Sequence, residues 1–273
     1  VPLQSNVSIT GNSPGLFEQT NGNDATVMLG NNDSVTGSSG IVARQNAIAG
    51  TGDVSVTLGN GNQVTGQGDD ATDPHNGNGI FAKNFGTPGA AGGGTTTVTL
   101  GDGNTIIATG VAGGGVSGIL PESLGGNVSI STGTGNIVIV NSGSGTGNNS
   151  GIFAGADEGA TPTSVTVNLG TNNTVSVTGG SNNSAINVRD FADNNAPVTG
   201  PVSLTVGRCS AQLSRALDNG AGTPSRFAGE QPPAIILQPR GWRGRARGRC
   251  SHNRRRNCAG RPTTQGRLAA GRL

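Results

Sequence analysis

The sequence predicts an all-β fold, a right-handed parallel β-helix (solenoid) of about six rungs that occupies residues 1–207. Two observations support this prediction. The first is that three short motifs recur in a fixed order along this part of the chain, and the second is that each motif places Val, Ile or Leu at the same offsets. The composition alone indicates disorder, because Gly, Asn, Ser and Thr dominate and 50 of the 273 residues are glycine. A disordered polar tract, however, has no need of periodic aliphatic residues.

The first motif reads V-x-V-T-L-G and predicts the first strand of each repeat. It alternates apolar with small polar residues, which is the period of a half-buried strand. Its copies are Thr26–Gly30, Val54–Gly59, Val98–Gly101, Val165–Gly170 and Val202–Gly207, with Val128–Gly133 as a degenerate member.

The second motif, N-x-V, follows two residues later and predicts a corner that leads into a second strand. Its first residues form the column Asp33, Asn62, Asn104, Asn136 and Asn173. We expect these residues to adopt the left-handed conformation, with side chains that hydrogen-bond up and down the stack. A ligand-binding column is the alternative.

The third motif, S-G-I-F-A, predicts the remaining strand. Its isoleucines, Ile41, Ile80, Ile119 and Ile152, are expected to lie directly over one another inside the coil. The residues that follow these isoleucines, and the one that follows Leu16 in the first copy, should point outward on a straight strand; they are Phe17, Val42, Phe81, Leu120 and Phe153. We expect loops such as residues 85–94 to cover this outer apolar column.

Two groups of residues are candidates for a functional site. Arg44, Lys83 and Arg189 stand three places after the isoleucine of the third motif, in a column that also holds Gln19, Glu122 and Gly155. This column either faces a ligand, such as an acidic glycan, or forms an exposed ladder in which Lys83 pairs with Glu122; the ladder is favoured. The second group is a loop cluster, Asp69, Asp70, Asp73 and His75. It has the residue types for Ca²⁺ or for acid–base chemistry, but a solvated insertion between rungs is the favoured interpretation of such a loop.

No recognised catalytic or cofactor-binding pattern occurs elsewhere. G-x-S-x-G, H-E-x-x-H and Walker motifs are absent from the sequence. Cys250, His252 and Cys258 lack a fourth ligand at a zinc spacing, so we assign no catalytic, cofactor or metal residues. No apolar run reaches the roughly 20 residues of a membrane-spanning helix.

Residues 208–273 form a segment of different composition. Of the 17 Lys and Arg residues, only Arg44, Lys83 and Arg189 precede Arg208, and all three cysteines follow Gly207. The expected N-x-V motif is missing after Gly207. We interpret this segment as a basic tail that is disordered or that arises from a shifted reading frame of GC-rich DNA. Its Arg-Gly pairs are also typical of nucleic-acid-binding segments, but we expect no nucleic-acid partner.

The alternation of V-x-V-T-L-G, N-x-V-x-V-T-G and S-G-I-F-A over about Asn6–Gly207 resembles the passenger (β-helix) region of Gram-negative autotransporters; filamentous-haemagglutinin-like surface proteins share this style. The resemblance implies export across two membranes and an extracellular location at the cell surface (outer membrane). It fixes no activity, because such passengers include adhesins, proteases and esterases.

The resemblance also implies that this chain is a fragment. Val1 lies inside the repeat pattern, and residues 208–273 contain no alternating strands of a membrane barrel, so membrane contact would come only through a barrel domain absent from this chain. We expect a non-enzymatic stalk or adhesive surface, whose partners are host or neighbouring-cell glycans or proteins. The alternative is a carbohydrate-active β-helix enzyme of the polysaccharide lyase or hydrolase type, built from residues 69–75 and the basic column.

Overall fold

The computed structural model describes residues 5–47, 51–68, 77–85, 93–110, 115–143, 147–158, 163–180, 182–192, 200–207, 212–215 and 236–237. The chain divides into two compact units, Val1–Trp242 and Arg243–Leu273, and all described residues belong to the first. Of the predicted tail, only Gln212–Arg215 and Ile236–Leu237 are described, each as a strand. The predicted boundary at residue 207 stays a prediction.

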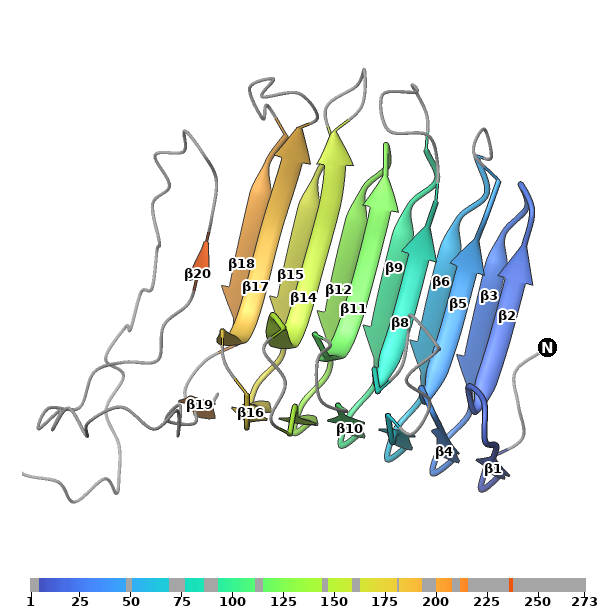
Figure 1. Cartoon of the computed structure of the whole chain (residues 1–273), viewed down its shortest axis with the longest axis vertical. Coiled ribbons are helices and arrows are strands. Elements are labelled where there is room, and N and C mark those ends of the chain that lie inside the picture. The colour runs from blue at the N-terminus through green and yellow to red at the C-terminus, as the bar shows by residue number, and fades with distance from the viewer. Residues whose placement is uncertain are drawn as a thin grey trace, which may run out of the picture. The chain divides into compact units, whose positions relative to one another are not determined.

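The described strands form three parallel sheets, in which every third strand of the sequence joins the same sheet (Figure 1). Sheet A holds β1 (Ser8–Thr10), β4 (Ser34–Gly37), β7 (Gln63–Gly66), β10 (Thr105–Thr109), β13 (Ile137–Asn141), β16 (Thr174–Thr178) and β19 (Gln212–Arg215). Sheet B holds β2 (Leu16–Thr20), β5 (Ile41–Gln45), β8 (Ile80–Asn84), β11 (Ser117–Leu124), β14 (Asn149–Glu158), β17 (Asn183–Ala192) and β20 (Ile236–Leu237). Sheet C holds β3 (Ala25–Leu29), β6 (Val54–Leu58), β9 (Thr96–Leu100), β12 (Val128–Thr132), β15 (Val165–Leu169) and β18 (Val202–Val206).

This strand order is that of a parallel β-helix, because three consecutive strands make one rung and each strand pairs only with its equivalents in the rungs before and after. Strands β1–β18 make six such rungs within the described residues, so the predicted fold is confirmed. No described helix is long and apolar enough to cross a membrane.

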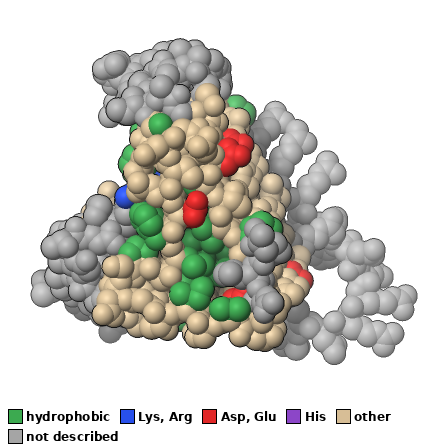
Figure 2. Space-filling model, turned by 90° about the vertical axis from the view of Figure 1, so that its right-hand side faces the viewer, with side chains coloured by type: hydrophobic (Ala, Val, Ile, Leu, Met, Phe, Trp, Pro, Cys, Tyr) green, Lys and Arg blue, Asp and Glu red, His purple; other side chains and the backbone are tan. Residues whose placement is uncertain are grey.

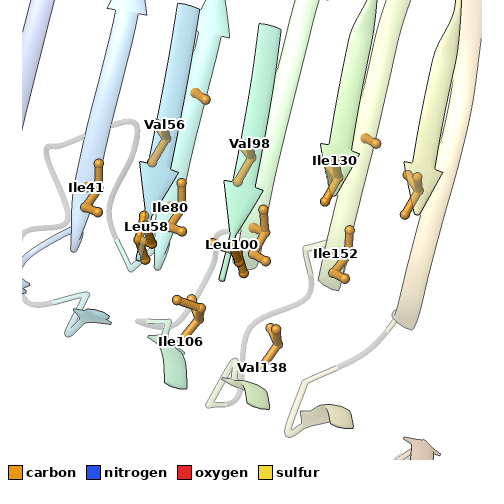
Figure 3. Close-up of a cluster of buried hydrophobic side chains, with 14 of the residues drawn as sticks. Ile41, Val56, Leu58, Ile80, Val98, Leu100, Ile106, Ile130, Val138 and Ile152 are labelled. Carbon is orange, nitrogen blue, oxygen red and sulfur yellow. The ribbon is translucent and has the colours of Figure 1, made fainter. Parts of the chain in front are cut away.

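The isoleucines of the third motif form one continuous interior column. Ile41 pairs in register with Ile80, which pairs with Ile119, then Ile152 and Ile186. All of these side chains are at most 1% exposed. They meet the valines and leucines of sheet C in a single core (Figure 3). The predicted stacking is therefore confirmed, and burial of each such side chain contributes about 1.5–3 kcal/mol.

The glycine of the third motif packs against the next rung so closely that no side chain fits at this position. A Cβ built on Gly118 would contact Val138 of β13 and lie 2.6 Å from the carbonyl oxygen of Gly151. The equivalent glycines Gly40, Gly79 and Gly151 each face a Val or Ile of the following N-x-V motif in the same way. Sheets A and B can approach this closely because this position lacks a side chain.

The Asp/Asn column of the second motif forms a buried ladder. The backbone N–H of Asn62 donates to Asn104 Oδ1 at 2.8 Å, and that of Asn104 donates to Asn136 Oδ1 at 2.9 Å. The same bond links Val7 to Asp33, Asp33 to Asn62, and Asn136 to Asn173. These ladder residues are at most 4% exposed, so they are enclosed by the protein rather than presented to a ligand. The hydrogen-bonded stack is confirmed.

The expected left-handed conformation of these ladder residues is wrong. The positive φ angles lie one position earlier, at Asn32, Gly61, Gly103, Gly135 and Asn172. The preceding residue makes the sharp corner, and the ladder residue that follows has its side chain buried inside the coil and its N–H bonded along the stack.

A second polar column runs along the exposed side of the same corner. The backbone N–H of Asn60 donates to Asn31 Oδ1, that of Asp102 to Asn60 Oδ1, and that of Thr134 to Asp102 Oδ1. Here each acceptor lies on the preceding rung, whereas in the buried ladder it lies on the following one. Together the two columns satisfy corner N–H groups that no strand pairs.

The first rung closes one end of the described coil only in part. Ile9 of β1 and Leu16 of β2 pack against the core but remain half-buried, and Phe17 is 50% exposed. Figure 2 shows hydrophobic side chains gathered in the middle of this end.

Candidate ligand-facing column on sheet B

The predicted basic column exists in the structure. In sheet B, Gln19 pairs in register with Arg44, Arg44 with Lys83, and Lys83 with Glu122. The column continues through Gly155 to Arg189. The residues on either side of the basic ones, such as Ala43 and Gln45, are buried, whereas Arg44, Lys83 and Arg189 are half-buried. Strand alternation therefore directs the basic side chains to the outer face.

The outer apolar column lies on the same face, two residues earlier on each strand. Phe17 pairs with Val42, Val42 with Phe81, and Phe81 with Leu120. Phe17 is exposed, but Val42 is fully buried and Phe81 is 4% exposed, so the outer column is covered along most of its length. Residues 86–92 of the loop expected to cover it lie outside the described residues, and that prediction is not tested.

The basic side chains cover part of this aromatic surface. The guanidinium carbon of Arg44 lies 5.1 Å from the ring centroid of Phe17, and that of Arg189 lies 4.4 Å from Phe153. Lys83 Nζ lies 4.7 Å from the ring of Phe85, just after β8. A cation within about 6 Å of a ring face is attracted by the ring quadrupole, by roughly 0.5–1 kcal/mol at exposed sites. In the sequence, Phe17 and Phe153 each stand two residues before a position of the basic column, but that spacing does not predict which cation leans over which ring.

The column also contains the predicted ion pair. Lys83 Nζ lies 2.8 Å from Glu122 Oε2, and the side chains of Lys83 and Glu122 are 21% and 24% exposed. One rung earlier, Arg44 Nε donates to Gln19 Oε1 at 2.7 Å. The predicted ladder is confirmed for Lys83 and Glu122. A pair this open to solvent contributes at most about 1 kcal/mol.

Glu122 and Arg189 stand two rungs apart in the column, and Gly155 between them has no side chain. Burial lowers the pKa of the Arg189 guanidinium, and the nearby Glu122 carboxylate partly opposes that shift.

The column presents three cations and one carboxylate on a flat sheet face. Neighbouring rungs are about 4.8 Å apart, so Arg44 and Arg189, four rungs apart, are separated by about 19 Å along the stack. A compact anion cannot reach both. An extended, repetitive anionic chain fits this spacing better.

The loop cluster Asp69, Asp70, Asp73 and His75 lies outside the described residues, so its distance from Lys83 is not tested. Within the described part of the chain, no three His, Cys, Asp or Glu side chains gather as a metal site.

Sequence reasoning missed an interior polar row next to the basic column. Asn84 Nδ2 donates to the carbonyl of Gly52 at 2.7 Å, and Ser123 Oγ donates to that of Gly94 at 2.8 Å. In the last rung, Thr163 Oγ1 donates to Asp190 Oδ1 at 2.8 Å. These side chains fasten the corner between sheets B and C, and their signal is a polar residue at an inward position directly after the basic column.

No family model, curated protein or solved structure matches this chain significantly.

Proposed function

We propose that this chain is the stalk portion of an extracellular, autotransporter-like passenger, a spacer that holds other parts of a longer protein away from a cell surface. The supporting observation is the unbroken register of all three sheets through six rungs of the described chain. In such an array each rung contacts only its neighbours, so added rungs add length without a new core. The repeat motifs carry the resemblance to passengers.

The stalk role is tested by display. The chain is joined to a signal peptide and an autotransporter barrel, with an epitope at its N-terminus, in a Gram-negative host. We expect the epitope to bind antibody on intact cells and the coil to resist added protease. A variant with Ile119→Asp, which places a charge in the core, should lose protease resistance. Retention of the parent chain in the periplasm would contradict the proposal.

An adhesive role for the outer face of sheet B is the second candidate. It is favoured by the net positive column of Arg44, Lys83 and Arg189 beside aromatic rings, since cations and rings are the groups that bind acidic sugars. A glycan array that includes uronate and sialate polymers tests it. We expect binding that Arg44→Ala and Lys83→Ala abolish, while Thr57→Ala on the outer face of sheet C leaves it unchanged. Binding that all three variants retain would place adhesion elsewhere.

A further inference from the structure

The exposed corners of the coil contain a motif that neither the stalk nor the adhesive role uses. Among the described residues, the non-glycine positions with positive φ are Asn6, Asn32, Asn172 and Asn182. Each of the four begins an N-x-S/T triplet. This triplet is the acceptor sequence for an N-linked sugar. The fold requires Asn or Gly at such corners, because few other residues tolerate the left-handed conformation.

The corner divides each triplet between the two sides of the coil. Asn32 is exposed, Asp33 points inward as a ladder residue, and Ser34 lies on the outer face of β4. Asn172 is likewise exposed, and Thr174 begins β16 on its outer face. The asparagine and the hydroxyl residue, which a transferase must recognise together, are thus presented on the same surface.

The side chains of Asn32 and Asn172 are accessible to an enzyme. Neither carboxamide makes a hydrogen bond within the described residues, and a Cβ built on Gly135, one rung before Asn172, meets nothing within 4 Å. The contrast is Asn127, which begins the triplet Asn127–Ser129. Its Oδ1 accepts hydrogen bonds from the backbone N–H and the hydroxyl of Ser164, both at 2.9 Å. The fold therefore engages the carboxamide oxygen of Asn127, whereas the carboxamides of Asn32 and Asn172 make no such bond.

We propose that Asn32 and Asn172 are acceptor sites for N-linked glycosylation. Asn Nδ2 forms a bond to the anomeric carbon of a nucleotide-activated hexose, and the bond from that carbon to the phosphate oxygen breaks. The nucleoside diphosphate leaves with the electron pair, and the amide proton passes to a base of the transferase. The donor sugar and the transferase come from outside the chain. The assignment does not depend on the stalk role.

The test uses the folded full chain as acceptor. Purified protein is incubated with UDP-glucose and an N-glycosyltransferase that recognises N-x-S/T, and occupancy is measured by intact-mass and peptide mass spectrometry. We expect a hexose on Asn32 and Asn172. Occupancy of Asn127 should be at least ~10-fold lower, since two hydrogen bonds must break before its carboxamide can enter an active site.

Matched variants separate the triplet from the strand that carries it. Ser34→Ala and Thr174→Ala should each abolish the hexose at their own asparagine. Thr36→Ala and Ser176→Ala, two residues farther along the same outer faces, should leave it in place. Unmodified Asn32 and Asn172, in a reaction that modifies a control acceptor peptide, would overturn the proposal. Equal occupancy at Asn127, or modification that survives Ser34→Ala and Thr174→Ala, would overturn it as well.

Discussion

The inner and outer faces of sheet B follow different rules, although they belong to the same strands. On the inner face, Ile recurs at one position from Ile41 to Ile186, and every copy is buried. On the outer face, the column holds Gln19, Arg44, Lys83, Glu122, Gly155 and Arg189 in successive rungs. Stacking at about 4.8 Å per rung requires side chains of equal shape inside, whereas water accommodates any shape outside. The outer columns are therefore the part of the coil where residues can vary between rungs without loss of the core.

Removal of an interior isoleucine should have the largest effect on this contrast. Ile119 lies between Ile80 and Ile152 in the column and is fully buried, so Ile119→Ala leaves a cavity that neighbouring rungs cannot fill. We expect a loss of about 2–5 kcal/mol in the free energy of unfolding, measured by urea denaturation. The matched control is Ile139→Ala on the outer face of β13, where Ile139 is 37% exposed. A similar loss for both variants would contradict the division between faces.

Interruption of the buried ladder should have the next largest effect. Asn104 Oδ1 accepts from both the backbone N–H and Nδ2 of Asn62. Asn104→Ala therefore leaves the buried backbone N–H of Asn62 without an acceptor, which costs about 1–3 kcal/mol. The control is Asn60→Ala in the exposed column, where water can replace the acceptor of the Asp102 N–H. Urea denaturation of the two variants should show the smaller loss for Asn60→Ala.

A methyl group at the glycine of the third motif tests how closely sheets A and B approach. Gly118→Ala places a Cβ against Val138 and the Gly151 carbonyl, and we expect it to lower the free energy of unfolding by about 1–3 kcal/mol. In the sixth rung, Ala185 takes the place of this glycine. Ala185→Gly should therefore lower the free energy of unfolding by only roughly 0.5–1 kcal/mol. Equal effects of the two changes would argue against the close approach.

The contrast between faces also explains what the sequence could predict. The isoleucine column and the rows of the three sheets were predictable, because stacking repeats the same side chain at the same offset. The basic column and the pairing of Lys83 with Glu122 followed from the same register. The left-handed position was assigned one residue late, because Asn serves both as a corner residue at Asn172 and as a ladder residue at Asn173. The residue type cannot separate these two roles. They differ in backbone conformation and in the hydrogen bonds that the side chain makes, which only the structure shows.

Contacts between different columns were not predictable. Arg189 lies over Phe153 because two outer columns stand side by side, and a side chain four bonds long can lean across. The register of the strands predicts which column a residue belongs to, but it does not predict the rotamer that its side chain adopts. For the same reason, the interior hydrogen bond from Asn84 to Gly52 joins residues whose sequence offset is not constant from rung to rung.

The smallest effect on stability should come from loss of the ion pair on the outer face. This variant tests most directly whether the outer face of sheet B contributes to stability as the inner face does. Glu122→Gln removes the carboxylate partner of Lys83 while retaining a polar side chain, and we expect a loss of less than about 1 kcal/mol at low salt. That loss should vanish in 1 M salt, where the Debye length falls to about 3 Å. The same variant makes the column more positive, so retention on an anionic glycan matrix should increase. A variant that unfolds as readily as Ile119→Ala would show that Glu122 belongs to the structural half of the molecule, because only a buried or networked carboxylate has so large an effect.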